Sequence, residues 1–223
     1  MQKGRLIVID GSDGSGKATQ TKLLVQALKK TDISVRTLDF PQYEKNFFGK
    51  FVGECITGDY GDFLMLDPHI TSLVYAADRF ESSQKIQKWI DDGCTVVLDR
   101  YVSANQIHQG GKIFDSRKRK EFLLWLDKME FGVFQLPRPD IVIYLDVPIN
   151  MSVKLLQNAQ QKKKYIKEGK KDIVEQNYEY LENSRRSALW LARNNKNWIR
   201  VQCVKNNELR SIDDIHEEIM TII

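Results

Sequence analysis

The stretch that decides the fold is RLIVIDGSDGSGKATQTKLLVQAL, residues 5–28. Residues 6–9 form an apolar run typical of a strand buried on both faces. The apolar residues Leu23, Leu24, Ala27 and Leu28 then recur with helical spacing. A glycine-rich turn separates the two segments, and a helix after such a turn presents unpaired backbone N–H groups to an anion. This order predicts a phosphate-binding loop, against the alternative of an ordinary strand–helix turn.

Three glycines and a lysine supply the chemistry of this loop. Gly11, Gly14 and Gly16 let the backbone approach phosphate oxygens, and Lys17 adds a cation near the outer phosphates. The pattern G-x-x-x-x-G-K-[ST] departs at its last position, because Ala18 stands where a hydroxyl usually contacts Mg²⁺. The residues predicted to hold a nucleoside triphosphate are Gly11, Ser12, Gly14, Ser15, Gly16, Lys17, Ala18 and Thr19.

The composition is that of one globular domain. The chain has 223 residues, 42% hydrophobic and 29% charged, and its net charge of +4 is too small to indicate nucleic-acid binding. No apolar run approaches the roughly 18 residues that cross a membrane, and the N-terminus lacks the apolar core of a signal peptide. The three cysteines have no metal-ligand spacing, which favours a reducing compartment. We therefore expect a cytoplasmic protein that binds neither membranes nor nucleic acids.

Strand and helix patterns alternate along the chain, which predicts βαβ units around a parallel sheet. The expected strands are residues 6–10, 35–39, 95–99, 141–146 and 198–203. Asp67 and Pro68 mark the start of a helix that runs to about residue 91, and Ser211 with Asp214 resembles a capping box before a helix at 212–223. The expected fold class is α/β: a three-layer P-loop fold with about five parallel strands flanked by helices, in a single domain over residues 1–223.

One segment is strongly basic. Residues 160–171, QQKKKYIKEGKK, carry six lysines against one glutamate. Such a run is usually a solvated loop, and a nucleic-acid patch would need more stacking residues than Tyr165 alone. Because the chain already contains a phosphate site, we favour a short basic lid over about residues 158–172 that brings positive charge onto phosphates.

The strand expected at residues 95–99 ends in Asp99 and is followed by Arg100. An aspartate at a strand end beside the phosphate loop can hold the waters of Mg²⁺, and the planar fork of an arginine can grip a second phosphate. The alternative is a surface Asp-Arg dipeptide, and the position after a buried strand argues against it. The pair indicates a kinase that acts on a phosphorylated acceptor, with Asp99 as the metal residue.

Several short motifs, taken in order, resemble those of thymidylate kinases, the enzymes that phosphorylate dTMP with ATP. They are Asp13 in the loop, Phe40-Pro41-x-Tyr43, Tyr75-Ala-Ala-Asp-Arg79, Asp99-Arg100-Tyr101, Asn105, Gln109-Gly110 and the run from Pro139 to Pro148. Each motif is weak alone, but in this order they cover nearly the whole chain. The resemblance implies that ATP and dTMP are the substrates, that Mg²⁺ is the metal cofactor, and that the chain forms a homodimer.

The resemblance also implies roles for single residues. Tyr75 and Arg79 lie four apart on one helix face, where Tyr75 would stack on thymine and Arg79 would bond its carbonyl edge. The alternative is a core tyrosine and an arginine in a salt bridge. The residues implied for the acceptor are Asp13, Phe40, Tyr43, Tyr75, Arg79, Arg100, Asn105 and Gln109. Those implied for catalysis are Lys17, Asp13 and Arg100, without a protein general base, since the dTMP phosphate is already anionic.

The chain departs from the family pattern in places. Gly14 stands where many relatives have an arginine, and the lid has lysines instead. The lid residues expected to contact ATP are Lys162, Lys163 and Lys164. His108 replaces a usual Tyr or Phe beside the acceptor, and Ala104 replaces a frequent serine. Two alternatives therefore stay open: a kinase for another nucleoside monophosphate or a deoxynucleoside, and a non-catalytic nucleotide-binding module.

Overall fold

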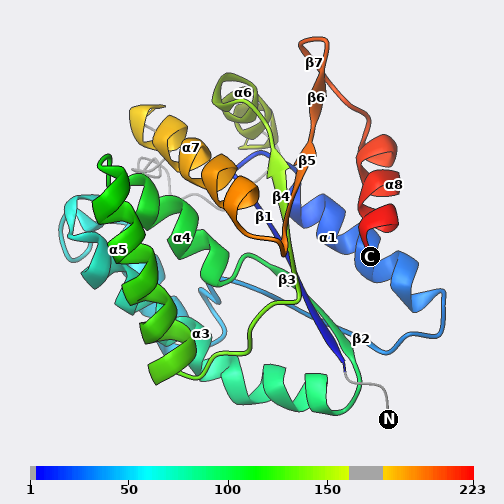
Figure 1. Ribbon diagram of the computed structural model, residues 1–223, viewed down its shortest axis with the longest axis horizontal. Coiled ribbons are helices and arrows are strands. Elements are labelled where there is room, and N and C mark those ends of the chain that lie inside the picture. The colour runs from blue at the N-terminus through cyan, green and yellow to red at the C-terminus, as the bar shows by residue number, and fades with distance from the viewer. Residues whose placement is uncertain (1–3, 161–177) are drawn as a thin grey trace.

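The computed structural model describes residues 4–160 and 178–223. Its centre is a five-stranded parallel sheet with the strand order β2-β3-β1-β4-β5 (Figure 1). The strands are β1 (Arg5–Gly11), β2 (Val35–Asp39), β3 (Thr95–Asp99), β4 (Ile141–Asp146) and β5 (Trp198–Gln202). All five predicted strands are confirmed; β1 is longer than expected by one residue at each end, and β5 is shorter by one residue at its C-terminal end.

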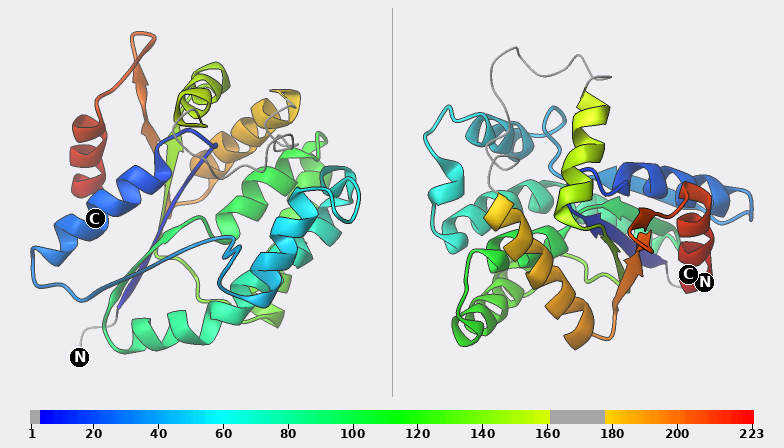
Figure 2. Two further views of the ribbon diagram at one scale, coloured as in Figure 1. Left: turned by 180° about the vertical axis from the view of Figure 1, so that it is seen from behind. Right: turned by 90° about the horizontal axis from the view of Figure 1, so that it is seen from above.

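Helices cover both faces of the sheet. On one face lie α1 (Lys17–Lys29) and α8 (Ile212–Ile222) (Figures 1 and 2). The opposite face is covered by α3 (Pro68–Asp91), α4 (Val102–Gly111) and α7 (Tyr178–Asn194), and α5 (Ser116–Asp127) packs on the outside of α3 and α4. The predicted three-layer α/β architecture is therefore confirmed.

The central strand β1 contributes to both layers of the core. Leu6 and Val8 pack with residues of α3, α4 and α7, whereas Ile7 and Ile9 pack with residues of α1 and α8. All four side chains are completely buried. Because successive side chains of a strand point to opposite faces, a strand covered on both sides needs the continuous apolar run seen in the sequence.

The predicted helix starts are also confirmed. Asp67 accepts a hydrogen bond from the His69 amide at 2.8 Å and caps α3, with Pro68 in its first turn. Ser211 accepts one from the Asp214 amide at 3.0 Å and caps α8. Within the described part of the chain, no helix combines the length and apolar character needed to span a bilayer.

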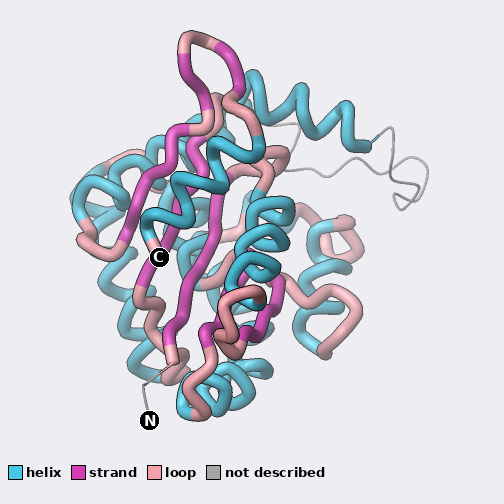
Figure 3. Tube along the Cα trace, turned by 90° about the vertical axis from the view of Figure 1, so that its right-hand side faces the viewer, coloured by secondary structure: helices cyan, strands magenta, loops and turns pink. Residues whose placement is uncertain are grey.

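Smaller elements complete the fold. They are α2 (Phe47–Ile56), the 3₁₀ turn η1 (Phe63–Met65), the π-helix η2 (Lys128–Val133), α6 (Ile149–Gln160), and the hairpin strands β6 (Val204–Lys205) and β7 (Glu208–Leu209). The hairpin extends beyond the end of β5 (Figure 3). Of the lid expected at 158–172, residues 158–160 continue α6 and the rest lies outside the described residues.

The parallel arrangement brings the carboxyl ends of the strands to one edge of the sheet. Asp10, Asp39, Asp99 and Asp146 all lie at or next to strand ends there. In open α/β sheets this edge is where ligands bind. The loop after β1 reaches the same edge, so the candidate site has to be sought there.

Candidate active site

The loop between β1 and α1 has the backbone of an anion site. Gly14 and Gly16 have φ angles of 79° and 88°, a conformation that favours glycine. A Cβ at Gly14 would stand 2.3 Å from the Ser152 carbonyl oxygen. Gly16 caps α1 without a side-chain hydrogen bond, which leaves the first-turn amides available to an anion. The buried hydroxyls of Ser12 and Ser15 have no partner among the described residues, so this loop fits the phosphates of ATP.

The three residues predicted for catalysis lie together beside this loop. Lys17 Nζ donates to the Ser12 carbonyl oxygen at 2.9 Å and lies 3.4 Å from Asp13 Oδ1. Arg100 Nη2 forms an ion pair with the same Asp13 oxygen. Arg100 has a φ of 64°, and its amide donates to the Ile9 carbonyl at 2.9 Å. The left-handed turn after β3 therefore directs the guanidinium toward the loop rather than into solvent.

The charges of these residues depend on one another. Burial by itself would raise the pKa of the Asp13 carboxyl, but Arg100 and Lys17 outweigh burial and hold that pKa well below its usual range. Burial lowers the pKa of the Lys17 ammonium, and the Arg100 cation lowers it further. Two cations thus share one carboxylate beside the phosphate loop.

Two further carboxylates lie at the ends of β1 and β3. Asp10 accepts hydrogen bonds from Ser103 Oγ at 2.6 Å and from the Gly11 amide at 2.8 Å. Burial raises the pKa values of Asp10 and Asp99, and the Lys17 cation opposes the shift of Asp99. Among the described residues no cluster of three or more His, Cys, Asp or Glu side chains forms an all-protein metal site. Mg²⁺ needs only one or two carboxylates when waters and phosphates complete its shell, so Asp99 beside the loop fits this ion.

A pocket opens next to Arg100 and is bounded by α2, α3, α4 and the start of α7. Its lining includes every residue predicted for the acceptor: Asp13, Phe40, Tyr43, Tyr75, Arg79, Arg100, Asn105 and Gln109. Its other lining residues are Pro41, Ile56, Tyr101, Ala104, His108 and Tyr180. Aromatic and apolar side chains thus form much of the wall, and Asp13 and Arg100 supply charge at the end beside the phosphate loop. This polarity matches a nucleotide, with a flat base and an anionic phosphate.

The floor of the pocket is a buried ionic network. Arg79 donates through Nε and Nη2 to the two carboxylate oxygens of Glu130, each at 2.8 Å. Asn105 Nδ2 donates to Glu130 Oε1 at 2.8 Å and to the Ser72 carbonyl at 3.0 Å. Arg79 Nη1 also lies 3.3 Å from the Tyr101 carbonyl oxygen, which accepts its hydrogen bond. Arg79 therefore lines the pocket, as an acceptor-binding arginine would, and also forms the salt bridge that the alternative interpretation predicted.

Three residues of this site, Glu130, Ile56 and Tyr180, were not identified from the sequence. Glu130 is completely buried in η2, and burial raises the pKa of its carboxyl against the opposing effect of Arg79. Its only sequence signal was an acid between the apolar residues Met129 and Phe131, which is equally typical of a surface position. Tyr180, at the start of α7, belongs to no motif. Ile56 and Tyr180 line the pocket, whereas Glu130 does not line it and supports it through Arg79 and Asn105.

A second cavity lies on the α8 side of the phosphate loop. It is lined by Gly14, Ser15, Gly16, Thr19, Gln20, Val147, Leu155, Cys203, Leu209, Arg210, Ile212 and Ile215. Of the two helix residues predicted to contact the nucleotide after Lys17, Thr19 lines this cavity and Ala18 does not. The turn at residues 205–207 forms the tip of the β6–β7 hairpin and does not line the cavity either, whereas the base of the hairpin does. The position next to the loop glycines suits the nucleoside of a triphosphate donor.

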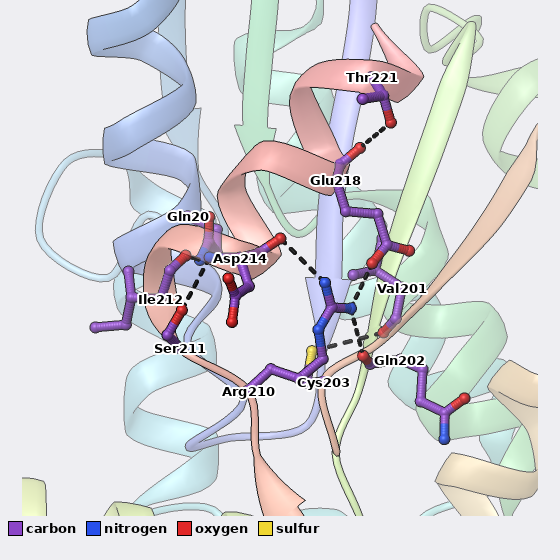
Figure 4. A network of polar contacts seen from close by, with 10 residues as sticks. All are labelled: Gln20, Val201, Gln202, Cys203, Arg210, Ser211, Ile212, Asp214, Glu218 and Thr221. Atoms are coloured by element: carbon purple, nitrogen blue, oxygen red, sulfur yellow. Dashed lines mark hydrogen bonds and ion pairs between the residues drawn. The ribbon is translucent and has the colours of Figure 1, made fainter. Parts of the chain in front are cut away.

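A polar network holds the wall of this second cavity in place (Figure 4). Arg210 donates to the carbonyls of Gln202 at 2.9 Å and Asp214 at 3.0 Å and pairs with Glu218. Gln20 Nε2 in α1 donates to the Ile212 carbonyl at 2.9 Å. These contacts tie the end of β5 and the start of α8 to α1. Lys162, Lys163 and Lys164, the lysines expected to approach from the lid, lie outside the described residues.

Comparisons with known proteins agree in one family. A family model described as thymidylate kinase matches residues 9–219. The thymidylate kinase of Mycobacterium tuberculosis is 31% identical over 147 residues, 66% of this chain and 68% of that protein. The thymidylate kinase of Schizosaccharomyces pombe is 27% identical over 221 residues, 99% of this chain and 92% of its relative. The solved thymidylate kinase of Candida albicans superposes with a TM-score of 0.69 at 23% identity, covering 99% of this chain and 91% of that one, a likeness of fold.

Proposed function

This chain belongs to the thymidylate kinase family, and we infer from that membership that it transfers the γ-phosphoryl group of ATP to dTMP, giving dTDP for dTTP synthesis. The observation that carries the inference is the meeting of two sites. The phosphate loop and the acceptor pocket share Asp13, which pairs with Arg100 on the pocket side and Lys17 on the loop side.

The reaction requires the protein to position the two phosphates and does not require a covalent intermediate with the protein. Phosphoryl transfer needs the two phosphates in line and the charge on the transferred group neutralised. The loop amides and Lys17 would hold the donor phosphates, and Arg100 would hold the acceptor phosphate. No protein base is needed, because the acceptor oxygen is already anionic near neutral pH. The lysines of the 158–172 segment would add positive charge from the donor side.

We assign the acceptor contacts by the chemistry of the lining residues. Phe40 and Tyr75 would contact the flat base, with Arg79 and Asn105 beneath it. Tyr43 would join Arg100 at the phosphate. The residues left for the sugar, which lies between base and phosphate in any nucleotide, are Asp13 and Gln109.

Mg²⁺ is proposed as the metal cofactor, held by Asp99 together with phosphate oxygens and water. When bound, it would neutralise charge on the donor phosphates. Ala18 offers no hydroxyl ligand, unlike the Ser or Thr that usually ends such a loop. Mg²⁺ would therefore depend more strongly on Asp99.

The homodimer is proposed from the outer face of α3. Ile70, Leu73 and Phe80 are 55%, 48% and 49% exposed. Together with Ala77 they are spaced three or four residues apart, so they lie on one side of the helix. A row of exposed apolar side chains marks an interaction surface, and a second copy of α3 would bury it. We further propose one kinase domain over residues 1–223 in the cytoplasm, where the free thiols of Cys55, Cys94 and Cys203 are stable.

The experiment that tests the function is ADP production from Mg²⁺–ATP with a panel of nucleoside monophosphates, deoxythymidine, and a control without acceptor. Turnover is expected to be fastest with dTMP. A clear preference for another acceptor would overturn the pocket assignment and keep the reaction class. ATP binding without turnover of any acceptor would make the chain a non-catalytic nucleotide-binding module.

Arg100→Ala tests the catalytic assignment. We expect kcat/KM for dTMP to fall on the order of 10³-fold, in the range that a phosphate-neutralising arginine contributes, with the fold unchanged by circular dichroism. Arg138→Ala is the matched control, because Arg138 pairs with Asp127 on the surface and does not line the pocket. Full activity of Arg100→Ala would remove Arg100 from the mechanism.

A further inference from the structure

Several side chains of the acceptor pocket have no assigned task, and His108 is one of them. His108 lies on α4 one turn after Ala104, and its ring lines the pocket. The ring stacks against Tyr180 with centroids 6.2 Å apart and an interplanar angle of 27°. Its charged neighbours include Arg100 and Asp13, so it lies toward the phosphate-loop end of the pocket.

The polar atoms of this ring are buried and unused. Neither Nδ1 nor Nε2 of His108 has a hydrogen-bond partner among the residues that the structure describes, and both atoms are covered. Burial, together with the Arg100 cation, lowers the pKa of the imidazole to about 3, so the ring is neutral under working conditions. A neutral imidazole carries one N–H donor and one acceptor nitrogen. Buried polar groups are normally hydrogen-bonded, and a ring that lines a binding pocket can find its partner in the ligand.

The chemistry of dTMP narrows the choice of partner. Its phosphate oxygens and base carbonyls accept hydrogen bonds, whereas a sugar hydroxyl both donates and accepts and so satisfies either tautomer of the imidazole. The phosphate already has Arg100 beside it. The aromatic wall, at Phe40 and Tyr75, suits the base. In a nucleoside monophosphate the sugar adjoins the phosphate, and the position of His108 near Arg100 and Asp13 matches the sugar.

We propose that His108 hydrogen-bonds the 3′-hydroxyl of the acceptor deoxyribose and is a specificity residue for that hydroxyl. This assignment rests on the proposed function, since it presumes that the pocket holds dTMP. It also accounts for a histidine at a position where a purely apolar or stacking side chain would fill the same space.

The test removes each partner of the contact separately and then both. His108→Phe keeps a ring against Tyr180 and deletes both nitrogens, and 3′-deoxy-dTMP deletes the hydroxyl. The kcat/KM values of wild type and variant are measured with dTMP and with 3′-deoxy-dTMP. We expect His108→Phe to lose about tenfold with dTMP, the size of one hydrogen bond, and to lose nothing with 3′-deoxy-dTMP. The variant would then discriminate between the two acceptors about tenfold less than wild type does.

Two controls keep the result unambiguous. His216→Phe on α8 removes another imidazole with a covered, unpartnered Nδ1, but His216 lies outside the pocket, so both kcat/KM values should stay at wild-type levels. His108→Gln, which restores a donor and an acceptor, should recover part of the discrimination. If the phenylalanine variant does not fold, His108→Leu provides the same comparison.

An equal loss with both acceptors in His108→Phe would overturn the proposal, because the nitrogens would then serve the phosphate, the base or the fold. Failure of wild type to turn over dTMP would instead contradict the proposed function itself. The wild-type dTMP rate thus separates the two kinds of failure.

Discussion

Asp99 and Asp39 occupy paired positions at the ends of neighbouring strands, yet their surroundings differ. Asp39 is 61% exposed and pairs with Lys45 at 2.6 Å, a surface contact that contributes little. Asp99 is partly buried, and burial raises the pKa of its carboxyl while Lys17 opposes the shift. A carboxylate held in this way beside a phosphate loop gains more from a cation ligand than one already neutralised in solvent.

Asp99 and Asp39 provide a matched test of the metal site. We expect Asp99→Asn to raise the Mg²⁺ concentration for half-maximal rate about tenfold or more and to lower kcat, because the site would then lack the carboxylate as well as the hydroxyl that Ala18 does not provide. Asp39→Asn should leave the Mg²⁺ dependence unchanged. Titrations of activity against Mg²⁺ at fixed ATP measure both, and identical curves for the two variants would exclude Asp99 as the ligand.

We also expect His108 to make stability depend on pH. Its folded-state pKa of about 3 lies below the unfolded value, so between pH 6.5 and 3 the unfolded chain binds a proton that the folded chain does not. The groups around the ring are Arg100, Asp13, Lys17 and Lys112, of which only Asp13 favours protonation. Stability contributed by this position therefore falls as the pH falls through that window.

We accordingly expect His108→Phe to gain stability relative to wild type on acidification, by about 2 kcal/mol between pH 7 and pH 5. Urea unfolding of both proteins at the two pH values gives the difference directly. A difference independent of pH would mean that the imidazole titrates normally in the folded chain.

At the scale of elements, Glu130 joins three helices. Its segment η2 directly follows α5 in the chain, and its carboxylate accepts hydrogen bonds from Arg79 on α3 and Asn105 on α4. Every one of these side chains is almost completely buried. A paired buried charge adds little net stability compared with an apolar core, but removal of one partner leaves the other uncompensated. The network therefore holds the floor of the acceptor pocket in one arrangement.

Glu130→Gln is expected to reduce the free energy of unfolding by about 3 kcal/mol, because the Arg79 guanidinium stays buried without a counter-charge. It should also raise KM for dTMP more than KM for ATP. Glu121→Gln is the control: Glu121 is 65% exposed, pairs with Arg117 one helical turn away, and should cost less than about 0.5 kcal/mol. Denaturant unfolding that shows equal effects for the two variants would contradict the role of Glu130.

At the scale of the whole molecule, α3 serves both the interior and the surface. Its inner side contributes Ala76, Arg79, Ile86 and Ile90 to the buried interior, while its outer side exposes the apolar row of Ile70, Leu73 and Phe80. A 24-residue helix that carries pocket-lining residues on one side and exposed apolar side chains on the other would link the pocket to an interface.

Size measurement by light scattering tests the assembly. Wild type is expected to behave as a dimer, and Leu73→Glu as a monomer, because a carboxylate in the middle of the apolar row would be desolvated on association. Leu124→Glu, at a position 64% exposed on α5, should remain a dimer. A monomeric wild type would remove the proposed interface.

Much of the fold was predictable because its signals are local. The strand ends at Asp39, Asp99 and Asp146, and the caps at Asp67 and Ser211, were predicted correctly since each depends on a few consecutive residues. The helices α2, α4, α5, α6 and α7 and the π-helix η2 were not delimited. In α4 and η2, buried polar side chains such as Asn105 and Glu130 obscure the apolar pattern.

The sequence by itself determined the phosphate loop, the parallel sheet and eight of the residues that line the acceptor pocket, because short motifs and strand periodicity encode them within a few residues. Only the tertiary structure decided which charges are paired. Arg79 meets Glu130 from 51 positions away, and His108 becomes neutral beside Arg100 and Tyr180. Such partners and protonation states depend on burial and on electrostatic fields created by distant segments, and those exist only once the chain has folded.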